Sequence, residues 1–143
     1  FDQPEDLRAA IGSLFGVMSM LVSSGVLILA RWWQSLLYNP GGFGREFREL
    51  RIDFRYAALL VVLILLSSFG ATLLQGWIMY FMLPLFFAGL ALVHGLAAIK
   101  RVSRIWLIMF YVVLISPLTV QILTVAALID SWYNFRGKIK PAA

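Results

Sequence analysis

The chain has no cysteine and only one histidine among its 143 residues. Disulfides, thiol redox chemistry and iron–sulfur clusters all require cysteine, and the usual zinc sites require sets of cysteine and histidine. The sequence also lacks a glycine-rich loop followed by lysine, paired histidines, and a serine with a basic partner in a plausible context. We therefore expect no metal, no cofactor and no catalytic activity of its own.

Charged residues are scarce as well. They make up 13% of the chain, against about 25% in an ordinary soluble domain, while 62% of the residues are hydrophobic. Three long tracts, 9–30, 56–99 and 105–129, contain no aspartate, glutamate, lysine or arginine. Because charge is costly inside a bilayer, this segregation predicts an all-α, polytopic transmembrane bundle that forms a single membrane domain over residues 1–143.

The lengths of the tracts predict the number of crossings. A helix rises about 1.5 Å per residue, so about 20 residues cross a hydrocarbon core of about 30 Å. The second tract is twice that length and must fold back, for which we expect a turn between Gly70 and Gly76. The third tract contains Pro117, which removes one backbone donor and predicts a kinked span. We expect about four spans, near 9–30, 56–74, 77–98 and 105–129.

The link between the first two tracts predicts a turn and a surface helix. Pro40 follows Asn39 and precedes two glycines, so we expect the first helix to end before Pro40. From Phe43 to Phe54, large apolar residues recur every three or four positions, with charged residues between them. That pattern is typical of an amphipathic helix lying along a membrane surface, and we expect one near 43–54.

Basic residues lie beside the apolar tracts, where anionic headgroups attract them. The net charge of +5 therefore indicates the lipid bilayer as a partner and not nucleic acid. The residues that we assign to headgroup contacts are Arg45, Arg48, Arg51, Arg55, Lys100, Arg101, Arg104 and Arg136.

The distribution of charge also predicts the orientation. With four spans, the two links carry eight basic residues and the opposite side carries four, which favours both links in the cytoplasm and the tail outside. A broken or re-entrant segment around Pro117 is the alternative, and it would place the basic tail inside.

Small side chains form two stripes at helical spacing. The members are Gly12, Gly16, Ser19 and Ser23 in the first expected span, and Ala88, Ala91, Gly95 and Ala98 in the third. Such stripes let membrane helices approach closely, so we interpret them as helix-packing surfaces. A flexible or substrate-lining seam is the alternative.

Few polar groups lie within the tracts. His94 is an ionisable residue inside the third expected span, which makes it a functional candidate, although Lys100 is close enough for an interfacial or packed position. Pro117, Gln121 and Thr124 share one face of the last span at about 100° per residue. We expect these residues to line a cavity for a small ligand. The alternative is that Gln121 and Thr124 only hydrogen-bond to neighbouring helices.

Two stretches, FFAGLALVHGLAAIKR and LIDSWYNFRGK, carry a resemblance to a known family. The matching features are Gly89, Ala91, His94, Asp130, Trp132, Phe135 and Arg136. They resemble the C-terminal part of the YybS-like family of predicted bacterial multi-pass membrane proteins, a domain of unknown function. Members of that family are longer, and the residues that follow Phe1 here show neither a basic n-region nor a small-residue cleavage site. We therefore expect the C-terminal part of a longer protein in the bacterial inner membrane.

That family is distantly similar to the substrate-binding subunits of energy-coupling-factor vitamin transporters. The resemblance implies a subunit that binds or transports a small solute. The small-residue pair with which those subunits dock their transmembrane partner is not evident in this sequence. The alternative is a non-catalytic scaffold or accessory subunit of a larger membrane complex, whose partners are other membrane subunits or further copies of the chain.

Overall fold

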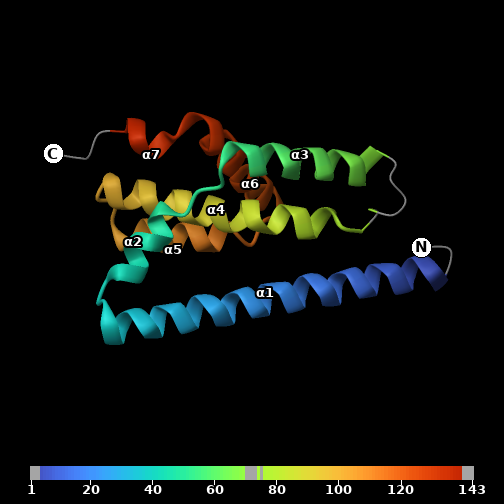
Figure 1. Cartoon of the computed structure of the whole chain (residues 1–143), viewed down its shortest axis with the longest axis horizontal. Coiled ribbons are helices and arrows are strands. Elements are labelled where there is room, and N and C mark those ends of the chain that lie inside the picture. Colours follow the sequence, from blue (N-terminus) through green and yellow to red (C-terminus); the bar gives the residue numbers. More distant parts are fainter. Residues whose placement is uncertain (1–3, 70–73, 75, 140–143) are drawn as a thin grey trace.

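The computed structural model describes residues 4–69, 74 and 76–139, and every regular element within them is a helix. The helices are α1 (Pro4–Tyr38), α2 (Gly42–Glu49), α3 (Phe54–Phe69), α4 (Ile78–Ile99), α5 (Arg104–Val113), α6 (Pro117–Tyr133) and α7 (Phe135–Lys138) (Figure 1). Two of them, α1 and α4, are long and apolar enough to cross a membrane alone. Up to four crossings result if each of two bent pairs, α2–α3 and α5–α6, counts as one. The described part of the chain is thus all-helical, as the sequence predicts, with two to four helical segments that are long and apolar enough to span a membrane.

Helix α1 is one continuous helix that extends beyond the predicted span at both ends. It ends at Tyr38, just before Pro40, because the residue ahead of a proline is pushed out of the helical conformation. Gly41 then adopts a left-handed conformation with φ of 80°, which costs glycine little, and the chain turns into α2. The side chain of Arg31 reaches across this turn and donates from Nε to Glu46 at 2.9 Å.

The prediction of a surface helix over 43–54 is wrong in its C-terminal limit, since α2 ends at Glu49. Leu50 already has an extended ψ of 118°, and α3 begins after Asp53 at an angle of 60° to α2. The Asp53 carboxylate accepts the backbone N–H of Arg55 at 2.9 Å and so caps the start of α3. The periodic spacing of apolar residues continues across this break, but the helical conformation of the backbone does not.

Helix α4 lies at the centre of the bundle. It runs beside α3 in the opposite direction, and its contact with α6 is the most extensive between any two described helices (Figure 1). Leu85, Ala91 and Leu92 of α4 are buried. Where α6 passes α4, a Cβ atom at Gly89 would lie 2.7 Å from the carbonyl oxygen of Leu123, so only glycine allows this approach. The turn expected between Gly70 and Gly76 falls mostly outside the described residues.

The kink expected at Pro117 is a 115° bend between two separate helices. Pro117 is the first residue of α6, and it holds Ser116 in an extended conformation with ψ of 129°. Helix α5 has 10 residues, or about 15 Å, which is half of a hydrocarbon core. The long kinked span expected over 105–129 is therefore corrected to a short helix, a sharp turn and a second helix.

The two helices of this pair run in opposite senses relative to α4. Tyr111 of α5 hydrogen-bonds to His94, so α5 runs back along the C-terminal half of α4. Pro117 lies with Met82 near the beginning of α4, whereas Arg136 in α7 lies against Gly95 near its end. Helix α6 therefore returns the chain to the end of the bundle from which α5 started.

Candidate functional site

Three of the four predicted ligand residues line one groove. Pro117, Gln121 and Thr124 of α6 face Leu21 of α1 and Met82 of α4 across a cavity of about 450 Å³. The lining is mainly apolar. The Thr124 hydroxyl donates to the Gln121 carbonyl oxygen at 2.8 Å, within its own helix. Among the described lining residues, the exposed side-chain amide of Gln121 is therefore the polar group left to meet a ligand.

His94 lies in a different cavity, so the single cavity expected for all four residues is wrong. It lines a space of about 350 Å³ together with Phe47, Phe87 and Tyr111. Its Nδ1 donates to the Leu90 carbonyl oxygen at 2.9 Å, so Nε2 accepts from the Tyr111 hydroxyl at 3.2 Å. The reversal at Pro117 explains the separation, because it places α5 and not α6 against this part of α4.

The two small-residue stripes have different surroundings. Ala88, Ala91 and Gly95 are buried on α4, and a Cβ atom at Gly95 would lie 3.0 Å from the carbonyl oxygen of Arg48. Ala98, at the end of the same stripe, is exposed. On α1, Gly16 lies directly against the hydroxyl of Tyr80, while Gly12, Ser19 and Ser23 are exposed.

A buried ion pair at the end of α6 corrects the headgroup assignment of Arg136. The side chain of Asp130 is 2% exposed and that of Arg136 is 12% exposed, and Arg136 Nη2 lies 2.9 Å from Asp130 Oδ2. The same guanidinium donates to the carbonyl oxygens of Arg48 and Leu50. Asp130 also accepts the Phe135 N–H at 2.8 Å. Arg136 thus points into the protein, where it ties the tail to the break between α2 and α3.

The sequence leaves three roles open for Asp130, namely a local pair with Arg136, a cap or a solvated boundary charge, and it carries one signal for the pair. Asn134 stands between the two charged residues and tolerates the left-handed conformation that ends a helix; its φ is 52°. A helix that ends there folds Arg136 back toward Asp130. The sequence does not show which backbone groups Arg136 contacts, because these groups are distant in the chain. Leu50, whose carbonyl oxygen accepts from Arg136, is 86 residues away from it.

The other predicted headgroup residues lie at the surface. Arg45, Arg51, Arg55, Lys100, Arg101 and Arg104 are exposed, and Arg48 is half-buried. The end of α1, helix α2, the link from α4 to α5, and α7 gather at one end of the bundle, while the start of α1 lies at the other (Figure 1). Both basic links and the basic tail therefore approach the same end.

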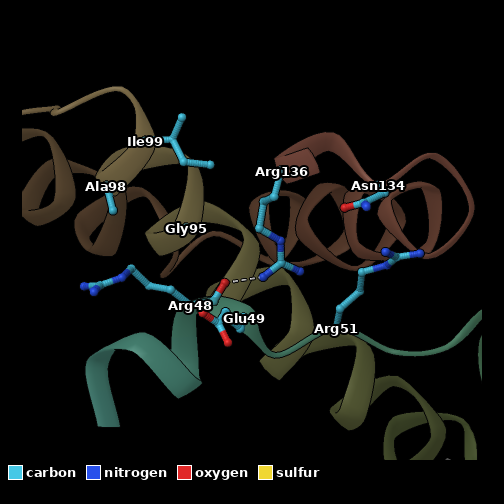
Figure 2. Close-up of a pocket in the computed structure, with 8 residues that line it drawn as sticks. All are labelled: Arg48, Glu49, Arg51, Gly95, Ala98, Ile99, Asn134 and Arg136. Atoms are coloured by element: carbon cyan, nitrogen blue, oxygen red, sulfur yellow. Dashed lines mark hydrogen bonds between the residues drawn. The ribbon is translucent and has the colours of Figure 1, made fainter. Parts of the chain in front are cut away.

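At that end, a cavity of about 420 Å³ opens between α2, α4 and α7. Figure 2 shows Arg136 pointing toward Arg48 and its backbone, with Arg51 on the other side and the end of α4 above. Arg51 donates to the Ser131 carbonyl oxygen at 3.0 Å. Glu49 contributes the one acidic side chain of the described lining.

Neither the metal-binding side chains of the described residues nor the comparisons with known proteins indicate what these cavities bind. Within the described part of the chain, no group of three or more histidine, aspartate or glutamate side chains is placed to hold a metal ion. Comparisons of the chain with protein-family models, with curated proteins and with solved structures gave no match. The resemblance to the YybS-like family stays a prediction.

Proposed function

We propose that the chain crosses the membrane three times and inserts one re-entrant hairpin. Helix α1, the broken pair α2–α3, and α4 are the three crossings, and α5–α6 is the hairpin. The observation that supports this arrangement is the 115° bend after a helix of only 10 residues. A helix of that length reaches about half-way through the hydrocarbon core before the chain turns back.

This arrangement gives a clearer orientation than four spans do. It places both basic links and the basic tail on one side of the membrane, and by sequence these segments carry eleven of the twelve basic residues, with Arg8 alone on the other side. The positive-inside rule then favours the cytoplasm for the side with the links and the tail, in the inner membrane of a bacterium.

Within this arrangement, the bundle is a non-catalytic subunit that binds a small, largely apolar solute for transport. The groove between α1, α4 and α6 supports this function. Its volume of about 450 Å³ lies within the range of about 300 to 1,000 Å³ usual for ligand pockets. Pro117, the first residue of α6, lines this groove beside the turn, and the Gln121 amide supplies one polar group to orient a bound molecule.

A scaffold or accessory subunit is the second candidate function, and the high exposure of α1 favours it. Only 6% of the most apolar 18-residue stretch of α1 is buried against the rest of the protein. Gly12, Ser19 and Ser23 leave a small-residue surface exposed along the same helix. Small residues are the usual contact surface between membrane helices, so a second membrane subunit or a second copy fits this face.

Filling the groove tests the transport-related function. Native mass spectrometry of the purified chain should detect a retained small molecule. The variant Met79→Trp places a large ring in the groove. It should lower the occupancy of the bound molecule about tenfold or more, which corresponds to a loss of about 1.4 kcal/mol in binding free energy. Ile122→Trp is the matched control, since Ile122 is exposed on α6 outside the described groove lining.

Two outcomes would count against this function. If the purified chain retains no small molecule, or if Ile122→Trp lowers occupancy as much as Met79→Trp, the groove is not the binding site. If the chain instead co-purifies with another membrane protein through α1, the scaffold function gains.

A further inference from the structure

Two cavities at the basic end of the bundle share a single side chain, Arg48. One is the basic cavity of Figure 2, between α2, α4 and α7. The other is the aromatic cavity that contains His94, between α1, α2, α4 and α5. Both lie along the C-terminal half of α4, whereas the groove proposed for the solute lies along its N-terminal half. This end is therefore a separate candidate site.

The aromatic cavity has the volume and the mainly apolar lining of a site for an apolar acyl chain. Its volume is about 350 Å³, and its walls include Ile28, Phe47, Phe87 and Tyr111. The ring of Phe47 packs edge-on against His94 with centroids 5.6 Å apart. The two nitrogens of His94 are occupied by Leu90 and Tyr111, so this wall presents carbon surface.

The basic cavity has one arginine available to an anion. Arg136 is engaged by Asp130 and two carbonyl oxygens, and Arg51 donates to Ser131. Within the described residues, the guanidinium of Arg48 makes no hydrogen bond or ion pair, and it lies 3.6 Å from the position of a Cβ atom on Gly44, in the wall of the aromatic cavity.

The local charge balance also favours an anion. The lining contains Arg48, Arg51 and Arg136, against Glu49 in the lining and Asp130 paired behind it, so one net positive charge remains. Arginine binds phosphate oxygens through two parallel hydrogen bonds, and basic pockets between membrane helices on the cytoplasmic side bind anionic headgroups.

We propose that this end of the bundle binds one anionic membrane phospholipid, with its phosphate on Arg48 and part of an acyl chain in the aromatic cavity. Arg51 and Arg136 hold the backbone around the phosphate and add positive charge. Their hydrogen bonds to the protein prevent them from turning fully toward the lipid. The proposal is independent of the solute groove, because no described residue lines both sites.

Lipid retention in native mass spectrometry tests the proposal. The full chain is purified from nanodiscs of phosphatidylglycerol and phosphatidylethanolamine in equal amounts, and retained lipids are counted for each variant. We expect one phosphatidylglycerol per chain in preference to phosphatidylethanolamine. Arg48→Gln should lower this retention about tenfold, because a hydrogen-bonded charge partner of the phosphate is lost. Arg45→Gln, an exposed arginine on the same helix outside the described cavities, should change it less than about twofold.

A second variant separates the contribution of the lipid's acyl chain from that of its headgroup. Ile28→Trp fills the aromatic cavity from the loosely packed α1 and leaves Arg48 intact, so it should also lower phosphatidylglycerol retention. Equal losses in Arg45→Gln and Arg48→Gln would mean diffuse surface attraction and would overturn the proposal. So would full displacement of the lipid by millimolar inorganic phosphate, since a soluble anion without an acyl chain would then be sufficient.

Discussion

Replacing Arg136→Ala should destabilise the folded chain by about 3 to 5 kcal/mol, because it leaves the buried carboxylate of Asp130 without its charge partner. The same change removes the hydrogen bonds that hold the carbonyl oxygens of Arg48 and Leu50 at the break between α2 and α3. Unfolding in mixed micelles of increasing denaturing detergent, followed by circular dichroism, measures the loss.

The exposed ion pair between Arg31 and Glu46 is the matched control. Its two side chains are 41% and 48% exposed, so Arg31→Ala should cost less than about 1 kcal/mol. The double variant Asp130→Asn with Arg136→Leu should lose less than the sum of the two single variants, because no unpaired charge remains buried. Equal losses from Arg31→Ala and Arg136→Ala would show that the buried pair does not hold the tail in place.

Replacing Gly89→Ala should separate α4 from α6 and destabilise the bundle by about 1 to 3 kcal/mol, the usual cost of overpacking. The added methyl group would lie 2.7 Å from the backbone oxygen of Leu123, which cannot move without moving α6. The same denaturation measurement applies. Because the groove of α1, α4 and α6 is built on this contact, the variant should also retain less of any bound solute.

Gly12→Ala is the control for Gly89→Ala, since both place a methyl group on a glycine within an apolar helix. A Cβ atom at Gly12 would meet nothing within 4 Å. Alanine is the better helix former, so this variant should be neutral or more stable by up to about 1 kcal/mol. A loss at Gly12 as large as the loss at Gly89 would mean that α1 packs more closely than the structure shows.

The sequence was sufficient to predict the helices whose limits depend on local signals. Charge-free tracts located α1 and α4, and Pro40 set the end of α1 because proline acts on the residue just before it. The end of α2 could not be predicted in this way. The periodic apolar residues continue to Phe54, and the break at Leu50 is held by Arg136, which lies far away in the sequence.

The candidate site was predictable only in part for a similar reason. Helical spacing correctly placed Pro117, Gln121 and Thr124 on one surface, since these residues share a helix. The position of His94 relative to them depends on the angle at Pro117. A proline in the sequence indicates a bend, but its angle of 115° depends on tertiary contacts: α6 packs extensively on α4, and Tyr111 of α5 hydrogen-bonds to His94.

Cysteine accessibility tests the three crossings and the re-entrant hairpin most directly, because the chain has no cysteine of its own. Leu7→Cys near the start of α1 and Lys138→Cys in α7 are expressed separately and treated with a membrane-impermeant maleimide, before and after the inner membrane is permeabilised. We predict that Leu7→Cys is labelled from outside and that Lys138→Cys is labelled only after permeabilisation. Labelling of both positions from the same side would mean an even number of crossings and would contradict the hairpin.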